Sequence, residues 1–203
     1  KTRGISLSQV LSRDSRNRAE FPTNGSTFIL ENTYSGGFLG GNENFQKHML
    51  TLDWFTPTFS KFILYNSVKL GVIKTLDVGD DIQSFVPFDE RFIMGGNGIP
   101  YGNALRGYPD NAIGPQTVSG QAVGGNSMGR LVTELRFSLS ENPVIYVMAF
   151  GEMGNVWNTS ALTEPFYINR FSSISMKKSA GVGVRFFMPG IGKLGFDMGY
   201  GFD

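Results

Sequence analysis

Apolar and non-apolar residues alternate with a period of two through most of this 203-residue chain. The alternation is clearest at residues 193–202, KLGFDMGYGF, where every second residue is large and apolar. A β-strand points successive side chains to opposite faces, so this period predicts strands with one apolar face. The pattern recurs along the chain and indicates an all-β protein.

Eight segments with this pattern are expected to be strands. Their connections alternate strictly between short and long, and the short ones include a tight turn at Phe21–Gly25. The non-apolar face carries charges and glycines, where the core of a soluble sandwich would need bulk. Transmembrane β-barrels have apolar outer faces, strands of about 9–11 residues, short turns on one side and long loops on the other. We therefore expect an antiparallel transmembrane β-barrel in preference to a soluble antiparallel sandwich. The expected strands are residues 3–13, 26–34, 46–56, 62–76, 130–139, 144–157, 177–188 and 193–202.

The longest segment without strand-like alternation is residues 77–126. Glycine and proline punctuate its centre, IMGGNGIPYGNALRGYPDNAIGP at residues 93–115, as a compact non-regular loop requires. The same stretch carries several large apolar residues, so we expect a folded loop packed against another part of the protein. An eight-stranded barrel would be filled by its own side chains. Either the loop lies outside such a barrel, or the eight strands are part of a wider one.

Composition excludes several classes of function. The formal net charge of +1 gives no field of one sign, so nucleic acid is not an expected partner. The chain has no cysteine, and therefore neither a disulfide framework nor a thiolate metal site. The longest apolar run, residues 144–150, is too short to span a membrane as a helix. Residues 1–11 alternate instead of forming the apolar block of a signal peptide.

The sequence predicts no catalytic site, no cofactor and no metal site. The single histidine, His48, lies on the apolar parity of its strand and is expected to be a surface residue. The chain has no GxSxG nucleophile elbow, and its paired glycines lack the strand-to-helix context of a phosphate-binding loop. The acidic pairs Asp80–Asp81 and Asp89–Glu90 are expected to be solvated loop charges. We therefore expect a protein that is not an enzyme.

Four segments, in this order, resemble the BamA family of outer-membrane protein assembly factors. The resemblance covers nearly the whole chain and implies that residues 1–203 are the C-terminal part of a sixteen-stranded barrel, short of its final strand. It also implies that the loop at about residues 77–126 folds into the barrel lumen. No POTRA domain, the periplasmic module of this family, is expected within these residues. The segments are RDSRN…FPTNGS at residues 13–26, GGNGIPYGNALRGYPDNAIGP in the loop, AVGGNSM at 122–128 and GEMGNVW at 151–157.

The resemblance further implies an ionic contact between the loop and the barrel wall. In the family, an arginine of this loop contacts acidic residues on the inner wall. Here the arginine is Arg106, and the matching acidic residues are Glu134 and Glu152. The alternation independently places both glutamates on the polar face of adjacent strands, where they can converge on one guanidinium. The alternative is that Arg106 is a solvated loop residue and the glutamates are two unrelated charges.

The residues around Arg106 complete a loop-docking motif, Leu105 to Tyr108. Gly107 is expected to permit a backbone conformation or a close approach that a side chain would block. Leu105 and Tyr108 are expected to be packing anchors.

The implied function is assembly and insertion of other β-barrel proteins in the outer membrane of a Gram-negative bacterium. Its implied partners are unfolded outer-membrane protein clients, accessory assembly lipoproteins and the lipid bilayer. Two alternatives stay open: a related two-partner secretion or translocation-and-assembly transporter, which shares the RGY loop, and a porin-like channel, which needs an open lumen. An outer-membrane hydrolase is disfavoured by the single histidine.

Overall fold

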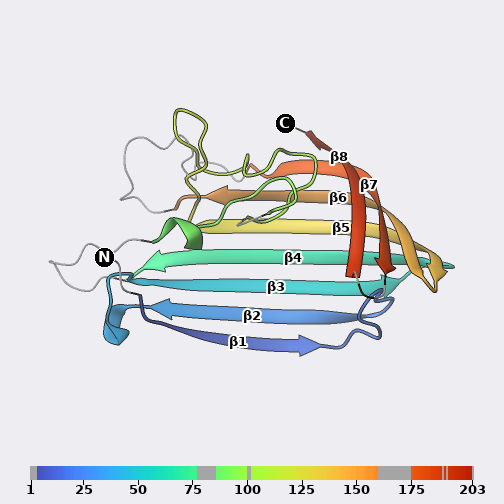
Figure 1. The fold of residues 1–203 in the computed structure, drawn as a ribbon, viewed down its shortest axis with the longest axis horizontal. Helices are drawn as coiled ribbons and strands as arrows, with labels where there is room; N and C mark the ends of the chain where they lie inside the picture. The colour runs from blue at the N-terminus through green and yellow to red at the C-terminus, as the bar shows by residue number, and fades with distance from the viewer. Residues whose placement is uncertain are drawn as a thin grey trace.

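A computed structural model describes residues 4–76, 86–99, 102–159, 175–188, 190 and 192–202. They form one antiparallel sheet of eight strands whose order in space is their order in the sequence (Figure 1). This confirms the predicted all-β antiparallel fold. The strands are β1 Ser6–Asp14, β2 Gly25–Ser35, β3 Phe45–Pro57, β4 Phe62–Thr75, β5 Ser127–Glu141, β6 Val144–Trp157, β7 Lys177–Met188 and β8 Gly192–Phe202.

The strand bounds follow the alternation closely. The strands β6 and β7 have the predicted bounds, while β5 begins at Ser127 instead of Arg130 because Ser127 still pairs with Trp157. The first strand begins at Ser6, later than predicted. Its connection to β2 is not the tight turn expected at Phe21–Gly25, because residues 15–24 lie between the two strands. The predicted second long loop, residues 158–176, and the pair Asp80–Asp81 lie largely or wholly outside the described residues.

The sheet has one apolar face and one polar face. Side chains such as Leu70, Val182 and Met198 point outward and are exposed, whereas Glu134 and Glu152 point to the other face and are buried. On the outer face, aromatic rings pair across strands near the short turns, with ring centroids 4.8 Å apart for Phe62 and Phe137 and 6.1 Å apart for Phe186 and Phe196. No helix in the described part of the chain is long and apolar enough to cross a membrane.

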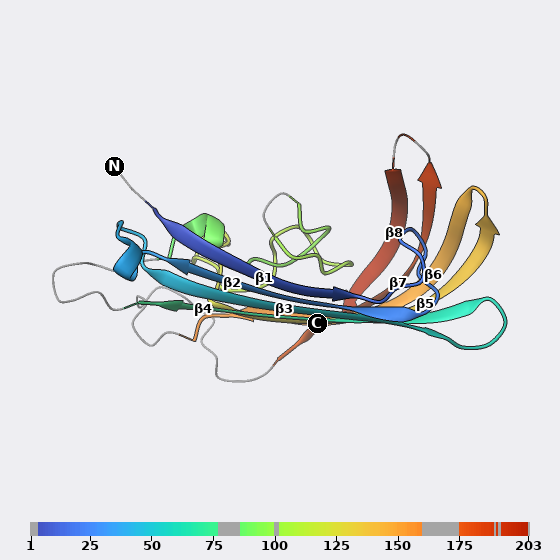
Figure 2. The ribbon, with the colours of Figure 1, turned by 90° about the horizontal axis from the view of Figure 1, so that it is seen from below.

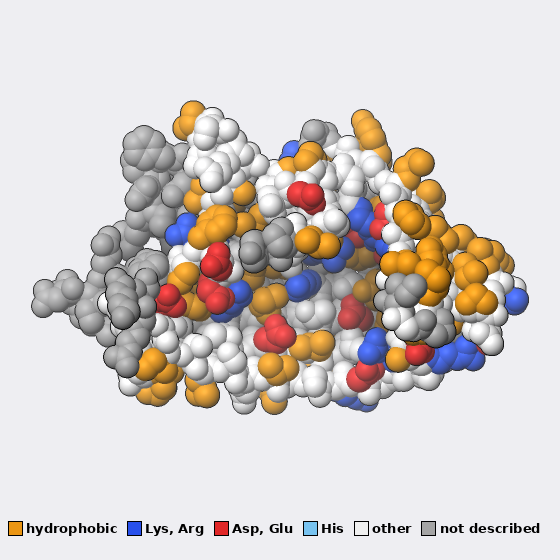
Figure 3. Space-filling model, viewed as in Figure 1, with side chains coloured by type: hydrophobic (Ala, Val, Ile, Leu, Met, Phe, Trp, Pro, Cys, Tyr) orange, Lys and Arg blue, Asp and Glu red, His pale blue; other side chains and the backbone are white. Residues whose placement is uncertain are grey.

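The sheet is curved and open. Within the described residues, β1 pairs with β2 alone and β8 pairs with β7 alone, so the eight strands do not close on themselves. The ends of β5 to β8 curve to one side, and the long loop lies on that same side (Figure 2). Charged side chains of both signs gather on this concave face (Figure 3). The described strands thus do not form a closed eight-stranded barrel with the loop outside it. The loop lies inside the curve of an open sheet.

The long loop has a structure of its own. Its described part, from residue 86, has a single turn of 3₁₀ helix at Phe88–Glu90 and then isolated bridges between its own segments. Met94 bridges to both Asn103 and Ile113, which brings the two arms of the loop together. The Gly96 amide donates to the Tyr108 carbonyl at 3.0 Å, and this bond holds the tip that carries Arg106. The loop is thus a compact unit and not an extended tether.

Candidate functional site

The two glutamates predicted on the wall lie side by side on the concave face. Glu134 of β5 pairs with Phe150 of β6, and Val132 of β5 pairs with Glu152 of β6, so the carboxylates are diagonal neighbours across one strand pair. Both side chains are almost completely buried, at 7% and 0% exposure. Buried carboxylates require charged or hydrogen-bonding partners. The wall therefore offers a paired anionic receptor for a cation.

Arg106 lies between these carboxylates. Its Nη2 donates to Glu134 Oε1 and to Glu152 Oε1, each at 2.6 Å, and its Nε donates to Glu152 Oε1 at 2.8 Å. The backbone amide of Arg106 donates to the other oxygen of Glu152, Oε2, at 2.8 Å. The planar fork of arginine suits this arrangement, because several donors in fixed geometry meet two acceptors at once. The structure thus brings together the three residues that the sequence pointed to.

The aromatic ring of Phe150 lies under the guanidinium. The Arg106 Cζ is 3.7 Å from the centroid of that ring, close enough for a cation–π contact. Burial lowers the pKa of Arg106, but Glu152 and Glu134 raise it by more, so this pKa lies above the ordinary value for arginine. The side chain therefore carries its charge at every physiological pH.

Further arginines complete the ionic network, and we did not predict them. Arg130 donates to Glu152 Oε1 at 2.9 Å, and Arg136 donates to Glu134 Oε2 through Nε at 2.8 Å. Both lie on β5 with the parity of Glu134, so the alternation already placed them on the concave face. Each glutamate is consequently shared between a wall arginine and the loop arginine. Without Arg106, Glu152 would still pair with Arg130 and Glu134 would still pair with Arg136.

Asp197 of β8 extends the network to the next hairpin. Its Oδ1 lies 3.6 Å from Arg106 Nη1, and its Oδ2 pairs with Arg185 Nη2 at 2.6 Å. The sequence showed Asp197 only as one charge on a strand face rich in glycine. Its closeness to Arg106 follows from the curvature of the sheet, which a strand pattern does not encode.

Gly107 and Tyr108 dock against β8. Gly107 has φ +88°, a conformation that favours glycine, and a side chain there would lie 2.7 Å from the Tyr200 backbone. Its expected close approach is thus to the backbone of the β8 strand. The Tyr108 hydroxyl lies 2.8 Å from the Lys178 carbonyl and 2.7 Å from the Phe202 carbonyl, so it bonds where β7 and β8 pair. The tip of the loop therefore touches four strands: β5, β6, β7 and β8.

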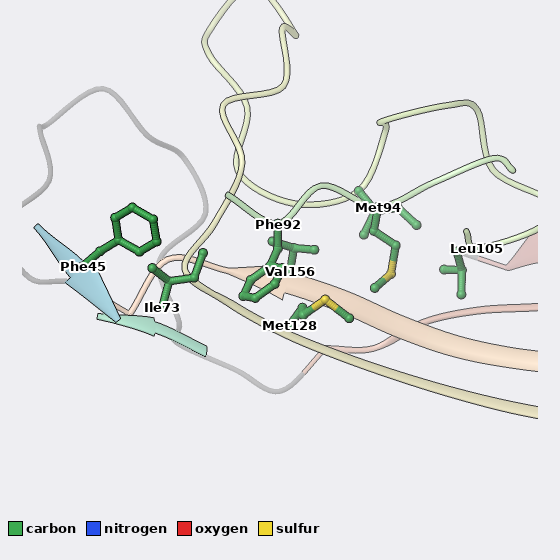
Figure 4. Packing of buried hydrophobic residues seen from close by; sticks show 8 residues of the cluster. Phe45, Ile73, Phe92, Met94, Leu105, Met128 and Val156 are labelled. Atoms are coloured by element: carbon green, nitrogen blue, oxygen red, sulfur yellow. The ribbon is translucent and has the colours of Figure 1, made fainter. Parts of the chain in front are cut away.

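Leu105 anchors the apolar side of the loop. It is fully buried and belongs to a cluster that joins loop residues to inner-wall residues (Figure 4). The loop contributes Phe92, Met94, Leu105 and Ile113, and the strands contribute Phe45, Ile73, Met128 and Val156. Burial of large apolar side chains contributes about 1.5–3 kcal/mol each, so this cluster supplies much of the docking energy.

Two lysines of the wall fix other parts of the loop. Lys69 of β4 donates to Asn103 Oδ1 at 2.8 Å, and Lys47 of β3 lies 3.0 Å from Glu90 Oε2. Neither contact was predicted. Together with the Arg106 contacts, they fix the described part of the loop at three points, Glu90, Asn103 and Arg106.

The remaining candidates for chemistry do not form a site. His48 Nδ1 lies 2.8 Å from Asn32 Oδ1 on the outward parity of β2 and β3. In the described part of the chain no group of three or more His, Cys, Asp or Glu residues is placed to hold a metal ion. Asp89 and Glu90 lie in the short 3₁₀ turn, and Glu90 pairs with Lys47.

Comparisons with known proteins identify the family by a domain model and find two similar proteins. A model of the Omp85 superfamily domain matches residues 1–203. The "Outer membrane protein assembly factor BamA" of Nitratidesulfovibrio vulgaris is 28% identical over 193 residues, which is 94% of this chain and 22% of that protein. The crystal structure of BamA from Haemophilus ducreyi lacking POTRA domains 1–3 aligns with a TM-score of 0.77 at 22% identity, over 98% of this chain and 39% of that one. The chain thus spans well under half of either relative.

Proposed function

The chain belongs to the Omp85 superfamily, and from this premise we propose that it is part of an outer-membrane protein assembly factor of the BamA type. Such a protein helps other β-barrel proteins to fold and insert into the outer membrane. The 28% identical relative is a curated assembly factor, which supports this member of the superfamily over its transporter branches. Within this proposal the chain is part of an assembly factor and not of an enzyme.

The sheet is part of the wall of an outer-membrane β-barrel. It matches part of the BamA barrel, and its exposed outer face is rich in apolar side chains. Within the proposal, residues 1–203 are the C-terminal part of that barrel, the concave face lines its lumen, and the outer face meets lipid. The aromatic pairs near the short turns fit the belt that such barrels place at a membrane interface.

One observation carries the proposal: the long loop lies on the concave face of the sheet and is held there by Arg106 between Glu134 and Glu152. A loop docked in this way occupies the lumen, which argues against a porin-like channel. We propose that the ion network specifies where the loop docks, while Leu105 and Tyr108 supply packing and Gly107 permits contact with β8. Unfolded barrel clients, accessory lipoproteins and the bilayer are the partners that this function requires.

The function is tested with the full-length protein in lipid vesicles. The probe is a urea-unfolded eight-stranded outer-membrane barrel protein, and its folding is followed by heat-modifiable electrophoretic mobility. We expect the full-length protein to accelerate folding over protein-free vesicles and Arg106→Ala to reduce that acceleration. A matched control is Lys61→Ala, which removes an exposed cation in the turn between β3 and β4. Equal folding rates with and without the wild-type protein would refute the proposed function.

A further inference from the structure

The connection between β1 and β2, residues 15–24, crosses the concave face instead of turning tightly. Its Phe21 is 5% exposed, and its ring lies 4.6 Å from the ring of Tyr146 on β6. The sheet order places β6 four strands away from β2, which corresponds to about 19 Å of flat sheet. Figure 2 shows this connection rising to the level of β7 and β8. Phe21 therefore reaches across the lumen-facing side.

Phe21 anchors a second apolar cluster, separate from the one under the long loop. The cluster contains Phe21, Phe55, Ile63, Tyr146 and Met148. All of the wall members lie near the ends of their strands where the short turns are found. The long loop enters from the other end, between the end of β4 and the start of β5. The two inserted segments thus approach the lumen from opposite ends.

The connection is organised by its own hydrogen bonds. Asn17 Oδ1 accepts from the backbone amides of Thr23 and Asn24 at 3.0 and 3.2 Å, and Asn17 Nδ2 donates to Thr23 Oγ1 at 2.6 Å. Ser15 donates its amide to the Ser26 carbonyl at 2.9 Å, which closes the base. These bonds hold the shape of the segment independently of the contacts made by Phe21. It is a compact loop with an apolar tip, suited to insertion.

Arg136 joins this cluster to the Arg106 network. Its Cζ lies 3.9 Å from the ring centroid of Tyr65 and 5.5 Å from that of Tyr146, which contacts Phe21. The same guanidinium pairs with Glu134 at 2.7 Å, and Glu134 pairs with Arg106 at 2.6 Å. A continuous series of contacts therefore runs from Phe21 to the tip of the long loop.

We propose that residues 15–24 are a second closing segment, which blocks the lumen at the short-turn end, and that Arg136 is a positioning residue that couples it to the docked long loop. The lumen is then closed from both ends by segments that share one wall arginine. Release of either segment weakens the docking of the other segment on the sheet, because both depend on contacts with Arg136. This inference concerns the state of the lumen and does not depend on which client the protein assembles.

The first test is limited trypsin digestion of the full-length protein in vesicles. Cleavage after Arg16 and Arg18 reports on the second closing segment, and cleavage after Arg91 and Arg106 reports on the long loop. Phe21→Ala is expected to accelerate cleavage after Arg16 and Arg18 at least tenfold, while Phe38→Ala, at a residue 88% exposed, leaves it unchanged. Unchanged cleavage in Phe21→Ala would overturn the closing role.

Coupling is tested with Arg136→Met, which keeps the length of the side chain and removes its charge. We expect faster cleavage in both segments, whereas faster cleavage in neither or in only one would overturn the coupling. The control is Arg13→Met, on an exposed strand residue. If Phe21→Ala fails to insert, Asn17→Ala serves in its place, because it loosens the segment without touching the wall. Single-channel conductance should rise in both Phe21→Ala and Asn17→Ala, and a steady wild-type value in both would also overturn the proposal. None of these readouts requires client assembly, so they can fail while the proposed function stands.

Discussion

Replacement of Arg106 by methionine removes the charge that the inner wall is built to receive, while much of the side-chain volume stays. The Arg106 side chain is 12% exposed, and its guanidinium bonds Glu134 and Glu152 at distances of 2.6–2.8 Å. We expect the long loop to undock more often in this variant. The apolar residues of the loop should stay packed against the strands. The substitution should therefore change the docking equilibrium of the loop and leave the fold intact.

The size of the effect follows from what remains on the wall. Removal of one partner from a buried ion pair costs about 3–5 kcal/mol when the other charge is left without compensation. Here Glu134 keeps Arg136, and Glu152 keeps Arg130. Each lost charge-assisted hydrogen bond contributes about 1.5–3 kcal/mol. We therefore expect docking to weaken by about 2–4 kcal/mol, which is about 30- to 700-fold in the ratio of docked to undocked loop.

Amide hydrogen exchange measures this ratio directly. Exchange of residues 102–115 in the full-length protein in lipid nanodiscs reports the opening equilibrium of the loop. Lys61→Met is the control, since that residue is exposed in a turn. Glu152→Gln should accelerate exchange as well, and the double variant with Arg106→Met should fall short of the sum because the two groups share one interaction. Equal exchange in wild type and Arg106→Met would show that apolar packing alone holds the loop.

Other perturbations test the packing around this network. Leu105→Ala leaves a cavity at a fully buried site and should weaken docking by about 2–4 kcal/mol, read from the same exchange experiment. Gly201→Ala places a methyl group about 2.7 Å from the Tyr108 ring and should displace it, whereas Gly151→Ala meets nothing within 4 Å and should leave exchange of the loop unchanged. Val182→Arg puts a charge on the outward face of β7, where about 2–4 kcal/mol of stability should be lost in urea unfolding from vesicles; an unaffected midpoint would contradict the assignment of that face to lipid.

The sequence predicted the strands of the sheet better than the contacts between the strands and the long loop. Alternation repeats along each strand, so the positions of β6 and β7 and the inward parity of Glu134 and Glu152 are local properties. The choice of Arg106 as their partner came from the resemblance to a family and not from spacing, because the loop has no period. A contact between a loop and a strand depends on the curvature of the whole sheet.

Two kinds of residue were missed for different reasons. Arg130 and Arg136 had the correct parity, but inward arginines on a barrel strand are common, and nothing local shows which carboxylate each one meets. The composition Phe-Pro-Thr-Asn-Gly predicts a tight turn, whereas the structure places Phe21 in a longer connection. Its true partner, Tyr146, lies far away in the sequence and is brought close only when β1 to β6 are assembled. Long-range contacts of this kind have no signature in a single sequence.

Close to the loop tip, the inner face of β8 carries glycines at positions 199 and 201. A Cβ at Gly199 would lie 3.0 Å from the Gly107 nitrogen and 3.2 Å from the Phe150 ring, so neighbours fill the room that side chains would take. The loop tip therefore lines this part of the sheet, and the large apolar side chains of β8 all lie on its outer face. Deletions or smaller side chains in the loop tip should therefore lower the local stability of β8, even though no residue of that strand has been altered.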